Sequence, residues 1–157
     1  MGVWKPTTLV LSSAGKKGFV IVGAISVFKK AGYLDNINHI IACSAGSMIA
    51  GGISLNFTPE EMVDIMMNMH LKDWNKKVDP VGGIFNGADL HERVKKQSGE
   101  TTLKEIQVKS GIRLTFATIN LTMGSTEYID TETHPDVKLS DAILMSSSIP
   151  FVFPCIE

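Results

Sequence analysis

The stretch HIIACSAGSMIAGG, residues 39–52, places the strongest constraint on what this chain can fold into. An apolar, β-branched run over residues 39–43 predicts a buried strand, and the small residues over 45–55 predict a helix directly after it. A strand and a helix can meet this abruptly only where the side chains at the junction are small. The stretch therefore predicts a sharp strand-to-helix turn centred on Ser44.

A second strand and helix come before this turn. Residues 8–12 predict a buried strand, residues 13–18 a loop, and residues 19–30 a buried helix that Gly32 follows. Strands and helices that alternate in this way indicate a parallel sheet with crossover helices. At 157 residues the chain has the size of about one domain, so we expect a single α/β domain over residues 1–157 with a three-layer α/β/α core.

The remainder of the chain continues the pattern. Thr58, Pro59 and Glu61 supply the cap, first-turn proline and capping-box glutamate of a helix. The further expected elements are a mobile loop over 73–87, amphipathic helices over 88–99 and 102–111, strands over 112–120 and 127–130, and a last helix capped by Ser140 and Asp141. The central sheet is expected to be mainly parallel.

A serine at such a turn has two interpretations. In a nucleophile elbow, usually written G-x-S-x-G, a strained turn exposes the serine hydroxyl at the carboxyl edge of the sheet. Ala42 and Gly46 stand at the two positions where an elbow needs small residues, and the following helix directs its positive end toward a developing oxyanion. Alternatively, Ser44 only caps the helix, as serine often does.

The loop over residues 13–18 is expected at the same sheet edge as Ser44, because it also follows a strand of the parallel sheet. Its backbone N–H groups can form a nest for an anion. The loop lacks the G-x-x-x-x-G-K-[ST] pattern of a P-loop, and no G-x-G precedes the helix as in a dinucleotide site.

Composition limits the expected partners and location. A net charge of −1 gives no reason to expect a nucleic-acid partner. Cys43 and Cys155 show neither metal-ligand spacing nor a disulfide framework, as is typical of a reducing compartment. No segment has the apolar length of a signal peptide or a transmembrane helix. We therefore expect a cytoplasmic or peripheral membrane protein.

Three blocks of the sequence, LSSAGKKGFVIVGAI, ACSAGS and LSDAILMSSSIPFVFP, resemble successive blocks of the patatin-like phospholipase family. The first is similar to the family's glycine-rich oxyanion loop, G-G-G-x-[KR]-G, and the second to its G-x-S-x-G elbow. The third is similar to the S-x-x-x-P-x-x-F-P stretch that precedes the catalytic aspartate. The resemblance covers essentially the whole chain, although Ser13, Ala14 and Ala42 replace glycines of the family pattern.

This resemblance implies a lipid acyl hydrolase of the phospholipase A or esterase type, acting without a metal or organic cofactor. The implied substrate is a phospholipid or another acyl-ester lipid, reached through peripheral membrane contact. Ser44 is the implied nucleophile. The residues implied to bind the oxyanion and substrate are Ala14, Gly15, Lys16, Lys17, Gly18 and Ala45.

The resemblance also implies a Ser-Asp dyad whose aspartate lies in a D-G-[GA] turn after the F-P stretch. That turn is expected beyond residue 157, so the domain is expected to be incomplete at its C-terminal end. Asp130, Asp136 and Asp141 are the nearby alternatives, and none fits the role of general base by its place in the sequence. The histidines are interpreted as structural or solvated; they are His39, His70, His91 and His134.

Several alternatives stay open. The chain is either the hydrolase or a catalytically impaired lipid-binding or interaction module of the same fold. Lys16 and Lys17 either hold an anionic headgroup or are simply solvated. The stripe of Met62, Met66 and Met69 favours core packing over an acyl channel. Cys43 is interpreted as buried filler beside the serine.

Overall fold

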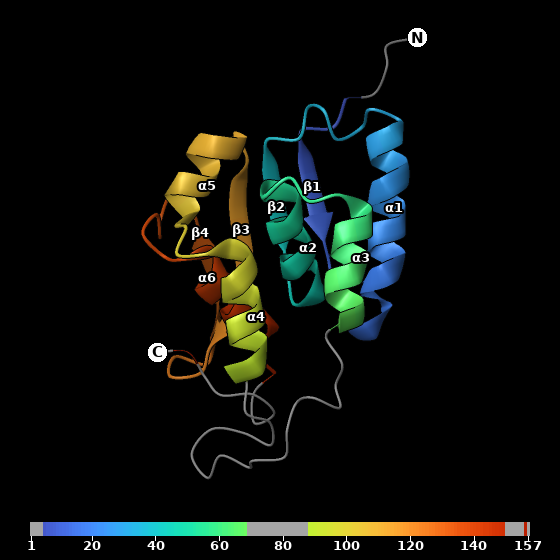
Figure 1. Ribbon diagram of the computed structural model, residues 1–157. Coiled ribbons are helices and arrows are strands. Elements are labelled where there is room, and N and C mark those ends of the chain that lie inside the picture. Colours follow the sequence, from blue (N-terminus) through green and yellow to red (C-terminus); the bar gives the residue numbers. More distant parts are fainter. Residues whose placement is uncertain (1–4, 69–87, 150–155, 157) are drawn as a thin grey trace.

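The computed structural model describes residues 5–68, 88–149 and 156 (Figure 1). Its elements are β1 (Thr8–Leu11), the 3₁₀ turn η1 (Gly15–Lys17), α1 (Gly18–Lys30), β2 (His39–Ala42), α2 (Ala45–Ser54), α3 (Pro59–Asn68), α4 (Ala88–Ser98), α5 (Leu103–Ser110), β3 (Arg113–Asn120), β4 (Ser125–Asp130) and α6 (Leu139–Ser147). The expectations for Met69, His70, residues 73–87, the F-P stretch and Cys155 fall outside the described residues.

The strands form one sheet in the order β1-β2-β3-β4. The first three strands are parallel, with Ala42 of β2 lying between Leu11 of β1 and Phe116 of β3. β4 returns antiparallel to β3 through a hairpin. The prediction that the first two strands are parallel neighbours is confirmed, and so is the mainly parallel sheet.

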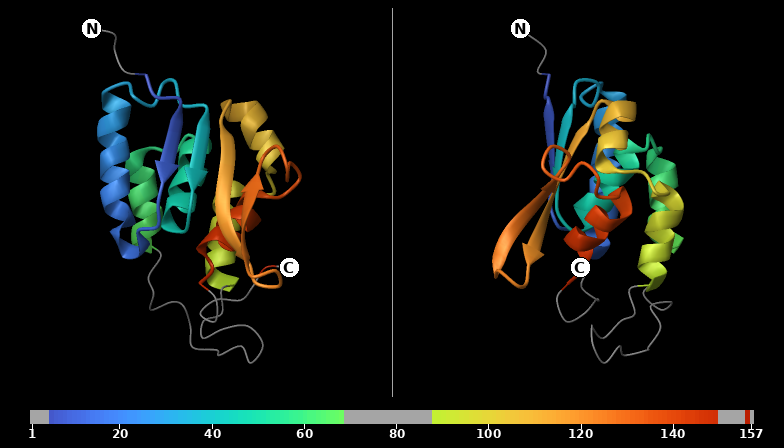
Figure 2. Two further views of the ribbon diagram at one scale, coloured as in Figure 1. Left: turned by 180° about the vertical axis from the view of Figure 1, so that it is seen from behind. Right: turned by 90° about the vertical axis from the view of Figure 1, so that its left-hand side faces the viewer.

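The described helices gather on one face of the sheet (Figure 2). α2 packs on β1 and β2, and α5 and α6 pack on β3. Strand alternation turns Ile40, Leu114 and Phe116 toward these helices, where they are fully buried, whereas Val10 on the other face is 68% exposed. The α/β class is confirmed, and the described residues hold two of the three expected layers, the sheet and one layer of helices.

The capping box that the sequence predicts at the start of α3 is confirmed. Thr58 accepts a hydrogen bond from the Glu61 N–H at 3.1 Å, and the Glu61 carboxylate accepts one from the Thr58 N–H at 2.7 Å. Thr102 and Glu105 form the same reciprocal box before α5. Each box satisfies two N–H groups that the first helical turn leaves without a partner.

The start of α6 differs from the prediction. Ser140 and Asp141 do not cap this helix, which begins at Leu139 with Lys138 in the cap position. The reason is tertiary, because the Leu139 N–H donates to the carbonyl of Thr101 at 2.9 Å and so fixes the helix start against the segment before α5. Ser140 is fully buried instead, with its hydroxyl 3.3 Å from the Asp141 carboxylate.

Strand ends also differ slightly from the predicted ranges. β2 ends at Ala42 rather than residue 43, because the carbonyl of Cys43 already belongs to the turn that follows. β4 begins at Ser125 rather than residue 127. Its first two residues are polar and carry no strand pattern, and their pairing with Asn120 and Ile119 across the hairpin recruits them into the sheet.

Candidate active site

Ser44 occupies a strained position between β2 and α2. Its backbone has φ 54° and ψ −124°, which are the angles of the first central residue of a type II′ turn. The carbonyl of Cys43 accepts the closing hydrogen bond of that turn from the Gly46 N–H at 3.0 Å. Glycine is the usual residue at this position because L-residues are strained there. Among the non-glycine residues that the structure describes, only Ser44 and Asn56 have positive φ.

The turn is tight because α2 starts against the end of β1. A β-carbon built on Gly46 would lie 2.4 Å from the carbonyl oxygen of Leu11. The Cys43 N–H donates to that same Leu11 carbonyl at 3.0 Å, which continues the strand pairing up to the turn. The requirement for a small residue at position 46, which the sequence predicts, therefore has a direct steric cause.

The Ser44 side chain does not cap α2. Within the described residues it makes no hydrogen bond to the first turn of that helix, so the capping interpretation is wrong for this structure. Ser44 is half-buried. Ser44 thus stands at the start of a helix and at the carboxyl edge of the sheet, and in the described structure its hydroxyl does not serve as the cap of that helix.

Two serines of α6 hold the peptide groups on either side of this residue. The Ser44 N–H donates to Ser146 Oγ at 3.1 Å, and Ser147 Oγ donates to the Ser44 carbonyl at 3.2 Å. Ser146 also accepts from Ser47 Oγ at 2.8 Å and donates to the Ala117 carbonyl of β3 at 2.7 Å. Sequence reasoning missed this contact, although the run of three serines at the end of an apolar helix marks its place.

The loop over residues 13–18 lies beside the elbow, as predicted from the order of the strands. Ser13 Oγ lies 3.4 Å from the Cys43 sulfur, and a β-carbon on Gly18 would lie 3.8 Å from that of Ala45. Gly15 has φ +50° and leads into η1. The structure therefore brings together the elbow and the loop, while the Lys16 side chain lies outside what the structure describes.

The backbone N–H groups at this edge differ in their availability. The Lys17 N–H donates to the Ala14 carbonyl at 2.9 Å, and the Gly18 N–H donates to the Gly15 carbonyl, so the 3₁₀ turn uses both. By contrast, the N–H of Ala45, the first residue of α2, has no partner among the described residues. An unpaired N–H at a helix start is a ready donor to an anion.

The acidic candidates lie away from Ser44. Asp130 pairs with Thr115 in the sheet and lines a hollow on the face opposite the helices, together with His39 and Arg113. Asp141 is in the first turn of α6, whereas the serines that contact Ser44 are in its last turn. Asp136 lies in the segment between β4 and α6. None of the three is hydrogen-bonded to Ser44 in the described structure.

Asp130 belongs to a polar cluster. Its carboxylate accepts hydrogen bonds from Thr115 Oγ1 and from the Glu132 N–H, and it pairs with Arg113 at 3.0 Å. Burial acts to raise the pKa of Asp130, but these three donors outweigh it and hold the pKa below its ordinary value. His39, at 2.8 Å from Thr115 Oγ1, has its pKa lowered by burial and by the charge of Arg113.

The other histidines are also remote from the serine. His134 lies near Glu127 on the β4 side of the sheet, with 3.9 Å between their side chains. The side chain of His91 and the whole of His70 are outside the described residues. In the described part of the chain, no three His, Cys, Asp or Glu side chains gather as a metal site requires.

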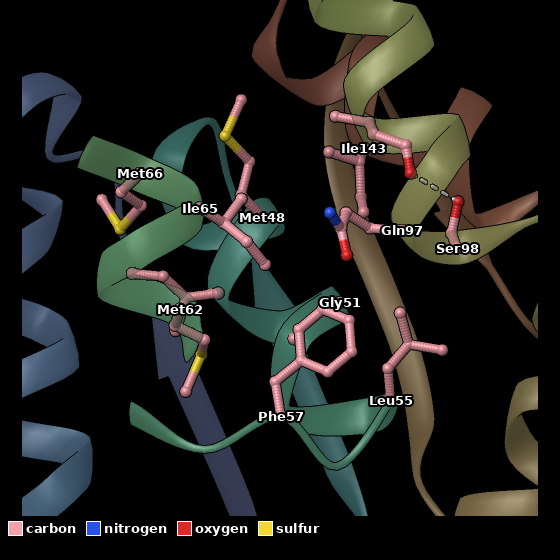
Figure 3. Close-up of a pocket in the computed structure, with 13 residues that line it drawn as sticks. Met48, Gly51, Leu55, Phe57, Met62, Ile65, Met66, Gln97, Ser98 and Ile143 are labelled. Carbon is pink, nitrogen blue, oxygen red and sulfur yellow. Dashed lines mark hydrogen bonds between the residues drawn. The ribbon is translucent and has the colours of Figure 1, made fainter. Parts of the chain in front are cut away.

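An apolar pocket lies between α2, α3, α4 and α6 (Figure 3). It is partly open to solvent. It extends along α2 from Met48, one turn after Ser44, to Leu55. Met62 and Met66 of the predicted methionine stripe face it from α3 (Figure 3), and Met62 also belongs to the buried core. Core packing and pocket lining therefore coincide at Met62.

No helix in the described ranges combines the length and apolar character needed to cross a bilayer.

Comparisons with known proteins identify a family and two viral relatives. The model of the family described as patatin-like phospholipase matches residues 9–157. A protein of invertebrate iridescent virus 6 named probable lipid hydrolase 463L is 28% identical over 93% of this chain and 54% of its own length. The uncharacterised protein R571 of Acanthamoeba polyphaga mimivirus is 29% identical over 92% of this chain and 52% of its own. The chain thus spans about half the length of these curated relatives.

Solved structures share the fold at low sequence identity. VipD from Legionella pneumophila superposes with a TM-score of 0.76 at 14% identity, covering 94% of this chain and 43% of VipD. ExoU, solved with SpcU from the type III secretion system of Pseudomonas aeruginosa, gives a TM-score of 0.63 at 16% identity, covering 93% and 39%.

Proposed function

This chain belongs to the patatin-like phospholipase family, and from that premise we propose that it hydrolyses acyl esters of lipids with Ser44 as its nucleophile. The observation that carries the proposal is the backbone of Ser44, held at φ 54° in a type II′ turn at the start of α2. A conformation this costly is kept where it serves a purpose, and here it presents a hydroxyl that has no capping role. The name of the viral relative, probable lipid hydrolase, points the same way.

The proposed reaction begins with attack of Ser44 Oγ on the acyl carbonyl, which yields an acyl-enzyme and releases the alcohol; water then attacks the acyl-enzyme, releases the fatty acid and restores the serine hydroxyl. The oxyanion is held by the Ala45 N–H, supported by the positive end of α2 and by loop residues Ala14, Gly15 and Lys16. Lys17 and Gly18 then have a structural part, since their N–H groups close the 3₁₀ turn. The serine proton must pass to a base, and we propose an aspartate outside residues 1–157.

We propose the pocket along α2 as the site of the acyl chain. Its lining is apolar and includes methionines, which adapt to irregular apolar ligands. Between Met48 and Leu55 the helix is roughly 10 Å long at 1.5 Å per residue. The substrate class is accordingly a phospholipid or another lipid ester with at least one chain of medium length.

Labelling with a fluorophosphonate tests the nucleophile. We expect the 157-residue chain to be labelled at Ser44, slowly, and to turn over short esters weakly because no described side chain acts as base there. A longer product of the same gene that includes a D-G-[GA] turn is expected to react about 100-fold faster or more. Ser44→Ala abolishes labelling, and Cys43→Ala retains most of it.

A folded protein of either length that is never labelled, or a Ser44→Ala variant with full activity, contradicts the hydrolase. The lipid-binding module of the same fold is then the better account. The replacement of family glycines by Ser13, Ala14 and Ala42 favours that alternative.

A chain-length series tests the pocket. Met48→Trp is expected to reduce hydrolysis of a decanoyl ester at least about tenfold while leaving a butanoyl ester nearly unchanged, because the added ring fills space that only the longer chain enters. Met67→Trp is the control, since Met67 follows the pocket-lining Met66 on α3 but is itself exposed and does not line the pocket. An equal loss on both esters in Met48→Trp would show that the chain binds elsewhere.

A further inference from the structure

We propose that Ser146 is a positioning residue that holds Ser44 in its strained conformation and thereby sets the direction of the nucleophilic hydroxyl. This inference rests on the proposed function for its kinetic part, whereas its conformational part does not need activity. Ser146 lies in the last turn of α6, 102 positions after Ser44. It is the first residue of the S-x-x-x-P-x-x-F-P stretch, which served above only as a mark of the family and was given no task.

The hydrogen bonds of Ser146 leave its hydroxyl no freedom. Its single proton goes to the Ala117 carbonyl at 2.7 Å, so both of its acceptor positions face α2. One of them takes the Ser44 N–H at 3.1 Å and the other takes Ser47 Oγ at 2.8 Å. One hydroxyl thus ties β3, α2 and the elbow to α6 with fixed proton directions.

This contact acts on the bond that defines the strain. Rotation about φ of Ser44 turns its N–H relative to the rest of the residue, so φ is fixed when this N–H and the carbonyl on the other side are both held. On the other side of the residue, the Ser44 carbonyl accepts from Ser147 Oγ at 3.2 Å and from the Ser47 N–H at 2.8 Å. Non-glycine residues keep such angles only where the surrounding structure holds them in place, and here the hydrogen bonds from Ser146 and Ser147 of α6 do so.

The arrangement also divides the N–H groups at the elbow between two tasks. The Ser44 N–H is occupied by Ser146 and cannot donate to an oxyanion. The next N–H, that of Ala45, is left for it among the described residues. Removing the Ser146 hydroxyl releases the Ser44 N–H from its partner and so loosens the conformation of Ser44.

The test compares Ser146→Ala, which loses three hydrogen bonds, with a variant that loses two hydrogen bonds elsewhere. Ser110 is the matched control, because its half-buried hydroxyl bonds the Ile106 carbonyl at 2.8 Å and the Ile112 N–H at 3.1 Å, far from the elbow. Two quantities are measured on the 157-residue chain, the hydrogen-exchange rate of the Ser44 amide by NMR and the rate of fluorophosphonate labelling at Ser44.

We expect Ser146→Ala to exchange the Ser44 amide at least tenfold faster and to be labelled at least tenfold more slowly, with Ser110→Ala unchanged in both. Ser146→Thr, which keeps a hydroxyl, is expected to recover most of each effect. If Ser146→Ala does not fold, Ser47→Ala replaces it, with a smaller change in the same directions. If Ser146→Ala and Ser110→Ala show the same exchange rate of the Ser44 amide and the same labelling rate at Ser44, the proposal is overturned. A folded wild-type chain that is never labelled counts against the hydrolase instead, and amide exchange then decides the role of Ser146.

Discussion

Asp130 shows at the scale of one residue how the sheet is stabilised on the face opposite the described helices. Its carboxylate is almost fully buried and is held ionised by Thr115, the Glu132 N–H and Arg113. A folded-state pKa below that of the unfolded chain means that the unfolded state binds more protons between the two values. The free energy of unfolding therefore falls as the pH drops from about 4 toward the lower folded pKa.

Asp130→Asn tests this dependence. We expect the variant to lose about 1–3 kcal/mol at neutral pH, because Arg113 and Thr115 lose a charged acceptor, and to show a flatter pH profile below about pH 4. Glu132→Gln is the matched control, since it removes the other carboxylate partner of Arg113. The Glu132 side chain is 61% exposed, so this substitution is expected to cost well under about 1 kcal/mol. Urea denaturation across pH measures both; parallel profiles for wild type and Asp130→Asn would contradict the assignment.

The residues of the site were predictable to different degrees. Ser44 is marked by its small neighbours, because the steric demand of the turn acts between residues close in sequence. Ser146 is not marked in this way, since its partners are contributed by α2 and β3 and only the folded chain brings them together. The use of the Lys17 and Gly18 N–H groups by a 3₁₀ turn is likewise a matter of loop conformation that residue types alone do not determine.

At the scale of elements, the contact between α2 and β1 depends on the absence of one β-carbon. Gly46→Ala would place a methyl group 2.4 Å from a backbone oxygen of Leu11, which no rotamer change can relieve. We expect the variant to lose about 1–3 kcal/mol or more. Gly23→Ala is the control: this exposed helical position has no atom within 4 Å of the added carbon, so alanine is expected to gain about 0.5–1 kcal/mol. Thermal unfolding of the pair distinguishes packing from helix propensity, and two variants of equal stability would refute the packing argument.

Elements were predicted best where the signal is local. The capping box at Thr58 and the apolar runs of β1 and β2 are local, so α3 begins where its cap predicts and the ends of β1 and β2 lie within one residue of the predicted ends. The start of α6 and the first residues of β4 depend on pairing with distant segments, through Thr101 and through the hairpin. Those ends were misplaced by one or two residues for that reason.

At the scale of the whole molecule, the β3–β4 hairpin reaches past the elbow. Ala42 and Phe116 are level in the sheet, and β3 continues for four residues beyond Phe116, roughly 13 Å at the rise of a strand. Its turn therefore projects from the edge that carries Ser44 (Figure 2). Leu121 and Met123 in this turn are 52% and 75% exposed, and the turn carries no charge. We propose it as the peripheral contact with a lipid surface.

Vesicle co-sedimentation tests this surface. Inserting one large apolar side chain gains about 1.5–3 kcal/mol at full burial, so Leu121→Ser with Met123→Ser is expected to weaken binding to zwitterionic phosphatidylcholine vesicles at least about tenfold. The binding is expected to be insensitive to salt because the turn is uncharged. Val108→Ser is the control, because Val108 is 79% exposed. It lies on α5, which precedes β3 and so stands at the edge of the sheet where β3 begins, away from the hairpin turn. Equal binding of wild type and double variant would exclude the hairpin as the contact.

The proposed link between Ser146 and Ser44 has a consequence for the order of events during synthesis. A ribosome adds about 5–20 residues each second, so the 102 positions between the two serines correspond to roughly 5–20 s. Through that interval the nascent chain contains Ser44 but does not yet contain Ser146, whose hydroxyl is proposed to hold Ser44 in its strained conformation. If Ser146 sets Ser44 as proposed, the strained geometry can form only when nearly all of the described domain has been made, and an unfinished chain on the ribosome would then hold Ser44 in a relaxed, unreactive conformation.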